Sequence, residues 1–203
     1  MPISITTPRG LQRLGPILRT LVTQVLRGEG RRVGEIAVVL DDDDLLRQIN
    51  CDWRGIDRAT DVISFAYDER EPDATKLAVR GDVLVSMDRV AAQARRFRVT
   101  PGTELARLVV HGALHLCGHD HLKPGERKLM RAREASGLRT AKPAARALDA
   151  VLARQVPTNP VAPARSAKPR SERATAPKPA RKPVTSRAAK PAAKLIAKRR
   201  KRA

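Results

Sequence analysis

Residues 103–121 read TELARLVVHGALHLCGHDH, and this stretch predicts both the centre of the fold and the functional site. From Thr103 to Leu116, apolar side chains wrap most of a helical circumference, which is typical of a helix buried in a core. Gly118 follows, and glycine is the usual residue just beyond a helix that ends in a left-handed conformation. We therefore expect a buried helix followed by a sharp turn at Gly118.

All the histidines of the chain lie in this stretch, at positions 111, 115, 119 and 121. His111 and His115 are four residues apart, so a helix places both imidazoles on one face, where they can bind one ion. The turn at Gly118 would bring His121 to a third coordination position. Three imidazoles leave a fourth position open to water, which is typical of a catalytic zinc site. The sequence thus predicts one Zn²⁺ per chain on His111, His115 and His121, with His115 also predicted to be catalytic.

The spacing H-x-x-x-H-x-x-G-x-x-H is that of the metzincin proteases, with one difference. Those enzymes carry a glutamate general base directly after the first histidine, where this chain has Gly112. A metallopeptidase is therefore disfavoured. We expect His119 to lie off the metal and Cys117 to be a packed apolar side chain. Asp120 has two open interpretations: it hydrogen-bonds a ligand histidine, or it stabilises the turn.

The rest of the chain predicts a small single α+β domain, with a mixed four-stranded sheet packed by helices. Short runs rich in β-branched residues indicate the strands, and apolar residues three or four apart indicate the helices. Strands and helices intermix without a strict βαβ alternation, which favours a mixed sheet. The expected strands are 3–6, 35–40, 60–66 and 81–86, and the expected helices are 11–26, 41–52, 87–97, 103–116 and 124–135, the last stopped by Gly137, with an exposed loop at 67–79.

Charge is distributed unevenly along the 203 residues, whose net charge is +20. Residues 142–203 hold 18 Lys and Arg against Asp149 and Glu172, so this end carries +16. Proline-rich, highly charged sequence of low hydrophobicity does not offset its ordering entropy. We expect a domain over 1–140 and a disordered basic tail over 141–203, with one short helix conceivable at 144–153. The tail should bind RNA phosphates without sequence preference, and a merely solubilising appendage is the alternative.

The cellular compartment follows from what the sequence lacks. The N-terminus has no basic region followed by an apolar stretch, and no apolar run approaches the ~20 residues of a membrane span. Cys51 and Cys117 form no recognisable disulfide framework, which favours a reducing compartment. We expect a soluble, cytoplasmic protein without a membrane partner.

The histidine stretch resembles the signature of the YbeY family, bacterial endoribonucleases of ribosomal RNA maturation. The resemblance extends over about residues 3–137, and it departs at His119, where many members have tyrosine, and at the basic tail. The matching residues are His111-Gly112-x-Leu114-His115-Leu116-x-Gly118-x-Asp120-His121, Asn50-x-x-Trp53-Arg54, Thr60-x-Val62-Ile63-Ser64-Phe65 and Gly81-Asp82-Val83.

This resemblance implies an α+β fold, a zinc-like metal on the three histidines, and cleavage of single-stranded RNA. It implies a role in 16S rRNA 3′-end maturation and ribosome quality control, with rRNA and the small ribosomal subunit as partners. It also implies that Arg54 lines the cleft and is catalytically needed. A guanidinium fork facing a phosphate would stabilise negative charge in the transition state. Without the resemblance, Arg54 would be interpreted as part of a surface salt bridge.

Several alternatives stay open at this point. The runner-up function is a non-catalytic ribosome-assembly or RNA-binding factor whose metal is structural. The attacking group can be water or the RNA 2′-OH. The proton acceptor can be Asp82, Asp120 or a substrate phosphate. The sequence does not indicate the oligomeric state.

Overall fold

A mixed four-stranded sheet forms the middle layer of the protein, whose computed structural model describes residues 3–67 and 78–154. The strands lie in the order β1-β2-β4-β3; β1, β2 and β4 are parallel, and β3 pairs antiparallel with β4 at one edge. The predicted α+β fold with a mixed four-stranded sheet is confirmed. The strands are β1 Ile3–Thr6, β2 Arg32–Asp41, β3 Val62–Ala66 and β4 Ala78–Ser86.

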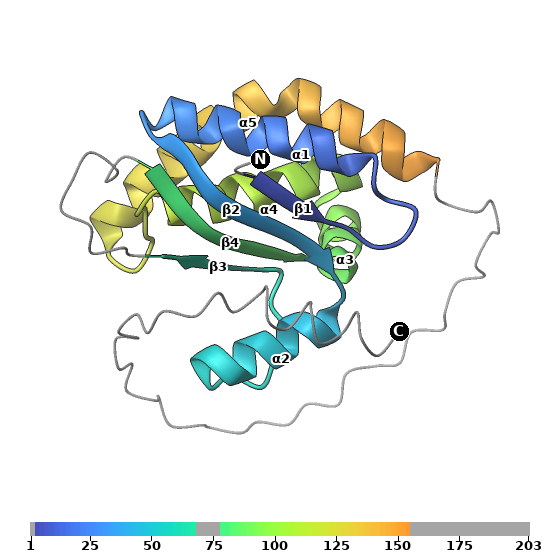
Figure 1. The fold of residues 1–203 in the computed structure, drawn as a ribbon, viewed down its shortest axis with the longest axis horizontal. Coiled ribbons are helices and arrows are strands. Elements are labelled where there is room, and N and C mark those ends of the chain that lie inside the picture. Colours follow the sequence, from blue (N-terminus) through green and yellow to red (C-terminus); the bar gives the residue numbers. More distant parts are fainter. Residues whose placement is uncertain (1–2, 68–77, 155–203) are drawn as a thin grey trace.

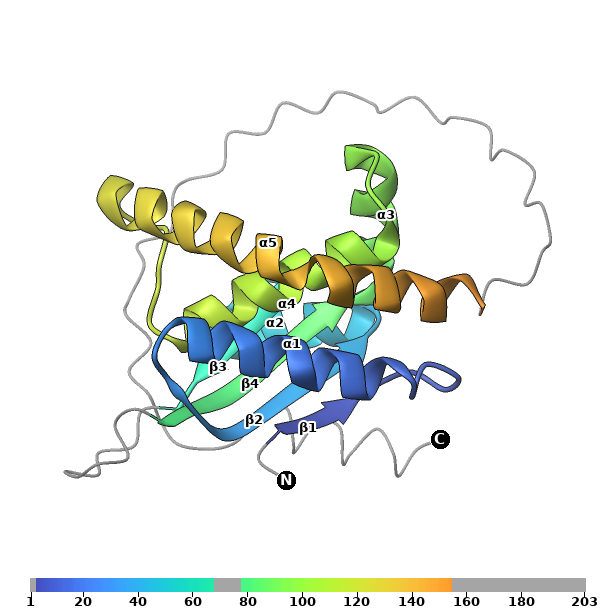
Figure 2. The same cartoon turned by 90° about the horizontal axis from the view of Figure 1, so that it is seen from above.

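Helices cover both faces of this sheet unequally (Figure 1). On one face, α1, α4 and α5 enclose the larger core, whereas on the other face α2 covers a smaller core that includes Leu46, Ile49 and Leu84. Figure 2 shows α4 between the sheet and α5. The helices are α1 Leu14–Gly28, α2 Asp43–Arg54, α3 Met87–Phe97, α4 Pro101–Leu116 and α5 Pro124–Ala153.

The central helix α4 begins slightly earlier than expected. The side chain of Thr100 accepts a hydrogen bond from the Thr103 backbone N–H, and Pro101 occupies the first turn. Both residues suit a helix start, because threonine caps free N–H groups and proline has none to leave unpaired. Leu105, Leu108 and Val109 are fully buried, so the predicted central, buried helix is confirmed.

The prediction that Gly137 ends the last helix is wrong, because α5 continues to Ala153. A Cβ atom on Gly137 would lie 2.9 Å from Val110 Cγ1, so glycine lets α5 approach α4 closely. The predicted boundary at residue 140 thus falls inside α5. The expected short helix at 144–153 is the last part of α5, where Ala145 and Leu148 are buried.

Some expectations concern residues beyond the described ones. Most of the expected loop at 67–79 and the predicted tail from 155 onward lie outside the described residues. Within the described part of the chain, no helix is both long and apolar enough to span a membrane. Both Cys51 and Cys117 are free thiols.

Candidate metal centre

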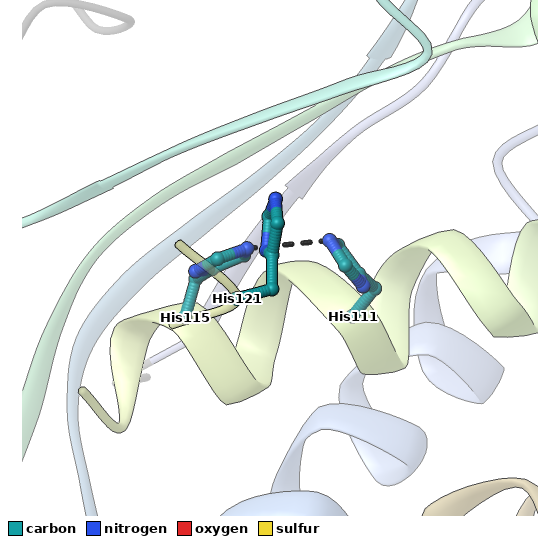
Figure 3. Close-up of side chains that lie close together, drawn as sticks. All are labelled: His111, His115 and His121. Carbon is teal, nitrogen blue, oxygen red and sulfur yellow. Dashed lines mark hydrogen bonds between the residues drawn. The ribbon is translucent and has the colours of Figure 1, made fainter. Parts of the chain in front are cut away.

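Three imidazoles converge at the C-terminal end of α4 (Figure 3). His111 and His115 lie on successive turns of α4 with their Nε2 atoms 3.2 Å apart, and His121 approaches from the following loop. One ring nitrogen from each histidine lies within 4.8 Å of the others. Two nitrogens that bind one tetrahedral zinc at about 2.0–2.1 Å lie about 3.3 Å apart. The predicted histidine group is therefore assembled, and it could hold a metal ion.

The turn after α4 returns His121 to the helix. Gly118 has a φ of 93°, and its N–H donates to the His115 carbonyl at 3.0 Å. The N–H of His119 donates to the Leu114 carbonyl at 3.1 Å. These two hydrogen bonds form a Schellman motif, which terminates a helix and reverses the chain direction. The motif explains why the third ligand comes so soon after the helical pair.

Asp120 and Arg127 hold the loop that carries His121. Asp120 Oδ1 accepts a hydrogen bond from the His121 backbone N–H at 2.7 Å, and Arg127 Nε donates to the His121 carbonyl at 3.2 Å. Asp120 Oδ1 also lies 3.9 Å from His121 Nδ1. Of the two interpretations of Asp120, the turn-stabilising hydrogen bond is present in the structure.

The surroundings of His115 lower the pKa of its imidazole. Burial lowers its pKa to about 4, and the positive charges that His111 and His121 acquire on protonation act in the same direction. The imidazole is therefore neutral at physiological pH, which is the form that binds a metal. Three imidazoles without a thiolate or carboxylate in the group fit zinc.

His119 and Cys117 lie within this segment but outside the histidine group. His119 Nε2 lies 2.8 Å from Glu29 Oε2 and so ties the loop to the end of α1. Cys117 packs against the main core, and burial, together with the Glu29 charge, raises its pKa to about 11. Both side chains therefore stabilise the structure around the site.

The packing around Gly112 explains why this position does not hold the glutamate of the protease pattern. A Cβ atom at this position would lie 2.6 Å from Val83 Cγ1 and 3.4 Å from Val62 Cγ2. The position therefore faces the sheet. A glutamate there would enter the core between α4 and the sheet, so it could not serve as a base at the metal.

The two carboxylates considered as proton acceptors occupy different faces. Val83 faces α4 through its contact with Gly112, and side chains alternate along a strand, so Asp82 points to the opposite face of the sheet. There Asp82 is buried and accepts a hydrogen bond from the Tyr67 hydroxyl. Burial, followed by this hydrogen bond, raises the pKa of Tyr67. Asp120, by contrast, is next to His121.

Arg54 is the last residue of α2, on the face of the sheet opposite α4. Trp53 packs edge-on against Phe65, with ring centroids 5.8 Å apart, and the Asn50 side chain donates to the Arg58 carbonyl at 2.7 Å. Asn50 and Trp53 thus anchor the end of α2, while Arg54 is exposed. Its part in catalysis stays a prediction.

Sequence reasoning missed Arg107 and Glu134, which lie beside the histidines. Arg107 is four residues before His111 on α4, and its Nη1 atom is 3.7 Å from Glu134 Oε1. The His111 ring, followed by Arg107, holds the pKa of Glu134 below its usual range. The spacing 107, 111, 115 could have identified Arg107 on the histidine face. Glu134 depends on how α5 crosses α4, for which the sequence carries no local signal.

Fold and site together define an α+β protein with a three-histidine centre at the end of its buried helix. Residues 10–142 match the family described as Endoribonuclease YbeY, and the chain belongs to this family.

Relatives described as Endoribonuclease YbeY share this domain. The relative from Anaeromyxobacter sp. (strain Fw109-5) is 40% identical over 133 residues, covering 66% of this chain and 67% of the relative. The one from Pelotomaculum thermopropionicum is 37% identical over 141 residues, covering 66% of this chain and 93% of the relative. Among solved structures, the solution structure of TM1509 from Thermotoga maritima is similar, with a TM-score of 0.48 and 29% identity over 67% of this chain and 86% of that chain.

Proposed function

We propose that this protein is a zinc-dependent endoribonuclease that cuts single-stranded RNA. The observation that carries the proposal is the group of three imidazoles, each with a ring nitrogen within 4.8 Å of the others, in a chain of the Endoribonuclease YbeY family. Its cellular role is maturation of the 16S rRNA 3′ end and ribosome quality control in the cytoplasm. The small ribosomal subunit is then its partner.

The three histidines would hold the zinc, and His121 is the most exposed of them. The His121 side chain is 50% exposed, whereas His111 is 22% exposed, so RNA approaches from the His121 side. When bound, zinc acts as a Lewis acid toward a phosphoryl oxygen and lowers the pKa of coordinated water. The low pKa of His115 keeps its imidazole neutral and available for binding at the pH of the cytoplasm.

Two further side chains complete the proposed reaction. Arg54 positions the scissile phosphate and stabilises its charge in the transition state. Asp120 is favoured over Asp82 as the proton acceptor, because Asp82 is buried and already hydrogen-bonded to Tyr67, whereas Asp120 lies beside His121. Asp120→Asn should reduce turnover, whereas Asp82→Asn should act through stability.

The test is cleavage of a single-stranded rRNA fragment by wild type and His115→Ala, purified identically and with the metal content measured on both. Wild type should carry about one zinc and cut, and the variant should do neither. If both preparations cut equally, the activity comes from a contaminant. If metallated wild type does not cut, a non-catalytic assembly factor with a structural metal is the better account.

The attacking group can be separated with the same assay. A substrate with a single 2′-deoxy nucleotide at the cut site lacks the 2′-OH nucleophile. Unchanged cleavage of this substrate means attack by water, and loss of cleavage at that position means attack by the 2′-OH.

We also propose that the basic C-terminal residues bind RNA phosphates. Residues 155–203 contain 15 Lys and Arg against Glu172, and such charge binds nucleic acid without sequence preference. Truncation after residue 154 leaves α5 whole. The truncated protein should bind RNA more weakly at low salt and with a shallower salt dependence. Unchanged affinity at low salt contradicts RNA binding by this segment.

A further inference from the structure

The two ring nitrogens of His111 face different surroundings. Nε2 is directed at His115, 3.2 Å from its Nε2 atom. Nδ1 is buried and, among the described residues, has no hydrogen-bond partner. The carboxylate of Glu134 lies 3.7 Å away from Nδ1, slightly beyond hydrogen-bond distance. A small adjustment of either side chain would convert this contact into a hydrogen bond.

Glu134 is fixed at this place by the packing of α5 on α4. Met130, one turn earlier in α5, is buried, and Gly137, one turn later, is where α5 approaches Val110 of α4. Positions 130, 134 and 137 share one face of a helix, so Glu134 must face α4. Its side chain is 20% exposed.

Arg107 contacts the same carboxylate oxygen. Its Nη2 atom lies 2.6 Å from Oε1 of the buried Glu104 and 3.1 Å from Gln93 Oε1, and its Nη1 atom lies 3.7 Å from Glu134 Oε1. A guanidinium held by two partners has little freedom to move away. The Glu134 Oε1 atom thus lies 3.7 Å from both a fixed cation and the imidazole of His111.

We propose that Glu134 is a positioning residue of the metal centre, which accepts the Nδ1–H of His111 and so directs its Nε2 lone pair toward the metal. This inference rests on the proposed function, because it assumes that the histidines bind zinc. A carboxylate on the far nitrogen of a ligand histidine fixes the tautomer and the ring orientation and raises the basicity of the ligand. Loss of such a partner reduces metal affinity by about 10- to 100-fold.

The test compares zinc affinity in metal-depleted, full-length wild type, Glu134→Ala, Glu134→Gln and Glu126→Gln, measured by competition with a chromophoric chelator. Glu126 is the matched control, because it also lies on α5 but pairs with the exposed Lys123 at 3.2 Å. Glu134→Ala should bind zinc about 10- to 100-fold more weakly. Glu134→Gln should retain part of the affinity, because its amide oxygen still accepts a hydrogen bond, and Glu126→Gln should match wild type.

The ring ¹⁵N shifts of His111 in the metal-free proteins provide a second readout, which general destabilisation would not move. Wild type and Glu134→Gln should show a proton on Nδ1, and Glu134→Ala should show a mixture of tautomers. Wild-type zinc affinity in Glu134→Ala, or an equal loss in Glu126→Gln, overturns the inference. If wild type itself binds no zinc, the proposed function fails first, and the inference fails with it.

Discussion

At its N-terminal end α4 is enclosed by α5, whereas at its C-terminal end it opens toward solvent and presents imidazoles. A Cβ atom on Gly102 would lie 2.5 Å from the Ala145 carbonyl oxygen, and the Gly102 N–H donates to Asp149 Oδ1 at 2.6 Å. A Cβ atom on Gly118 would have no neighbour within 4 Å, but its φ is 93°. One glycine is required by packing and the other by backbone conformation, so the same residue type serves stability at one end and ligand geometry at the other.

The largest effect is expected in the middle of α4, from Gly112→Glu. This change supplies the missing protease glutamate but forces a charged side chain against Val83. Overpacking and burial of an unpaired charge should together destabilise the protein by at least about 4 kcal/mol, without peptidase activity. Urea denaturation of the metal-free proteins measures this. Gly125→Glu is the matched control, because a Cβ atom at that exposed position in α5 would meet no atom within 4 Å. Equal stability of the two variants would contradict the packing of α4 on β4.

At the enclosed end, Gly102→Ala should lower the free energy of unfolding by about 2–3 kcal/mol, because the new methyl group meets backbone atoms of α5 that cannot rotate away. Its zinc affinity should change less than twofold, since the histidines lie at the other end of the helix. Urea denaturation measures the free energy of unfolding, and chelator competition measures the zinc affinity. A stable variant would show that α5 is not packed against this end of α4.

At the open end, Gly118→Ala should cost about 1–2 kcal/mol, because an L-residue is disfavoured at positive φ. Unlike Gly102→Ala, it should also weaken zinc binding, since the turn at Gly118 places His121. The same two measurements apply. If Gly102→Ala weakened zinc binding more than Gly118→Ala, the functional contrast between the two ends would be wrong.

The smallest effect concerns Cys117, directly after α4. Only the thiolate reacts with iodoacetamide, and a pKa of about 11 leaves about one thiolate per thousand molecules at pH 8. Cys117 should therefore be alkylated at least about tenfold more slowly than the exposed Cys51, and its rate should rise about tenfold per pH unit between pH 7 and 9. Peptide mass spectrometry over time measures both rates. Equal alkylation rates for the two thiols would mean that Cys117 is exposed to solvent and not packed against the core.

The parts that could be predicted from the sequence depend on local spacing. Two histidines four residues apart and a glycine three residues beyond the second are enough to specify a shared helical face and a turn back toward it. Local spacing alone therefore predicts the three-histidine group. The resemblance to the YbeY family rests on these residues and on three further short motifs at 50–54, 60–65 and 81–83, each of which is also local in the sequence.

The parts that could not be predicted depend on how distant elements pack. An isolated glycine costs a helix about 1 kcal/mol, which makes Gly137 resemble a helix end. Its contact with Val110 has no counterpart in the local sequence. The same crossing of α5 over α4 brings Glu134 to His111. The face occupied by Asp82 likewise depends on the contact between Val83 and Gly112, which are far apart in the chain.

The measurement that tests the central claim most directly is a zinc titration of metal-depleted wild type and four single variants. His111→Ala, His115→Ala and His121→Ala each remove one proposed ligand, and His119→Ala removes the neighbouring imidazole that pairs with Glu29 instead. Wild type and His119→Ala should bind one zinc per chain with similar affinity, and the other three should bind at least about 100-fold more weakly. Tight binding by any of these three variants, or an equal loss in His119→Ala, would contradict the three-histidine centre.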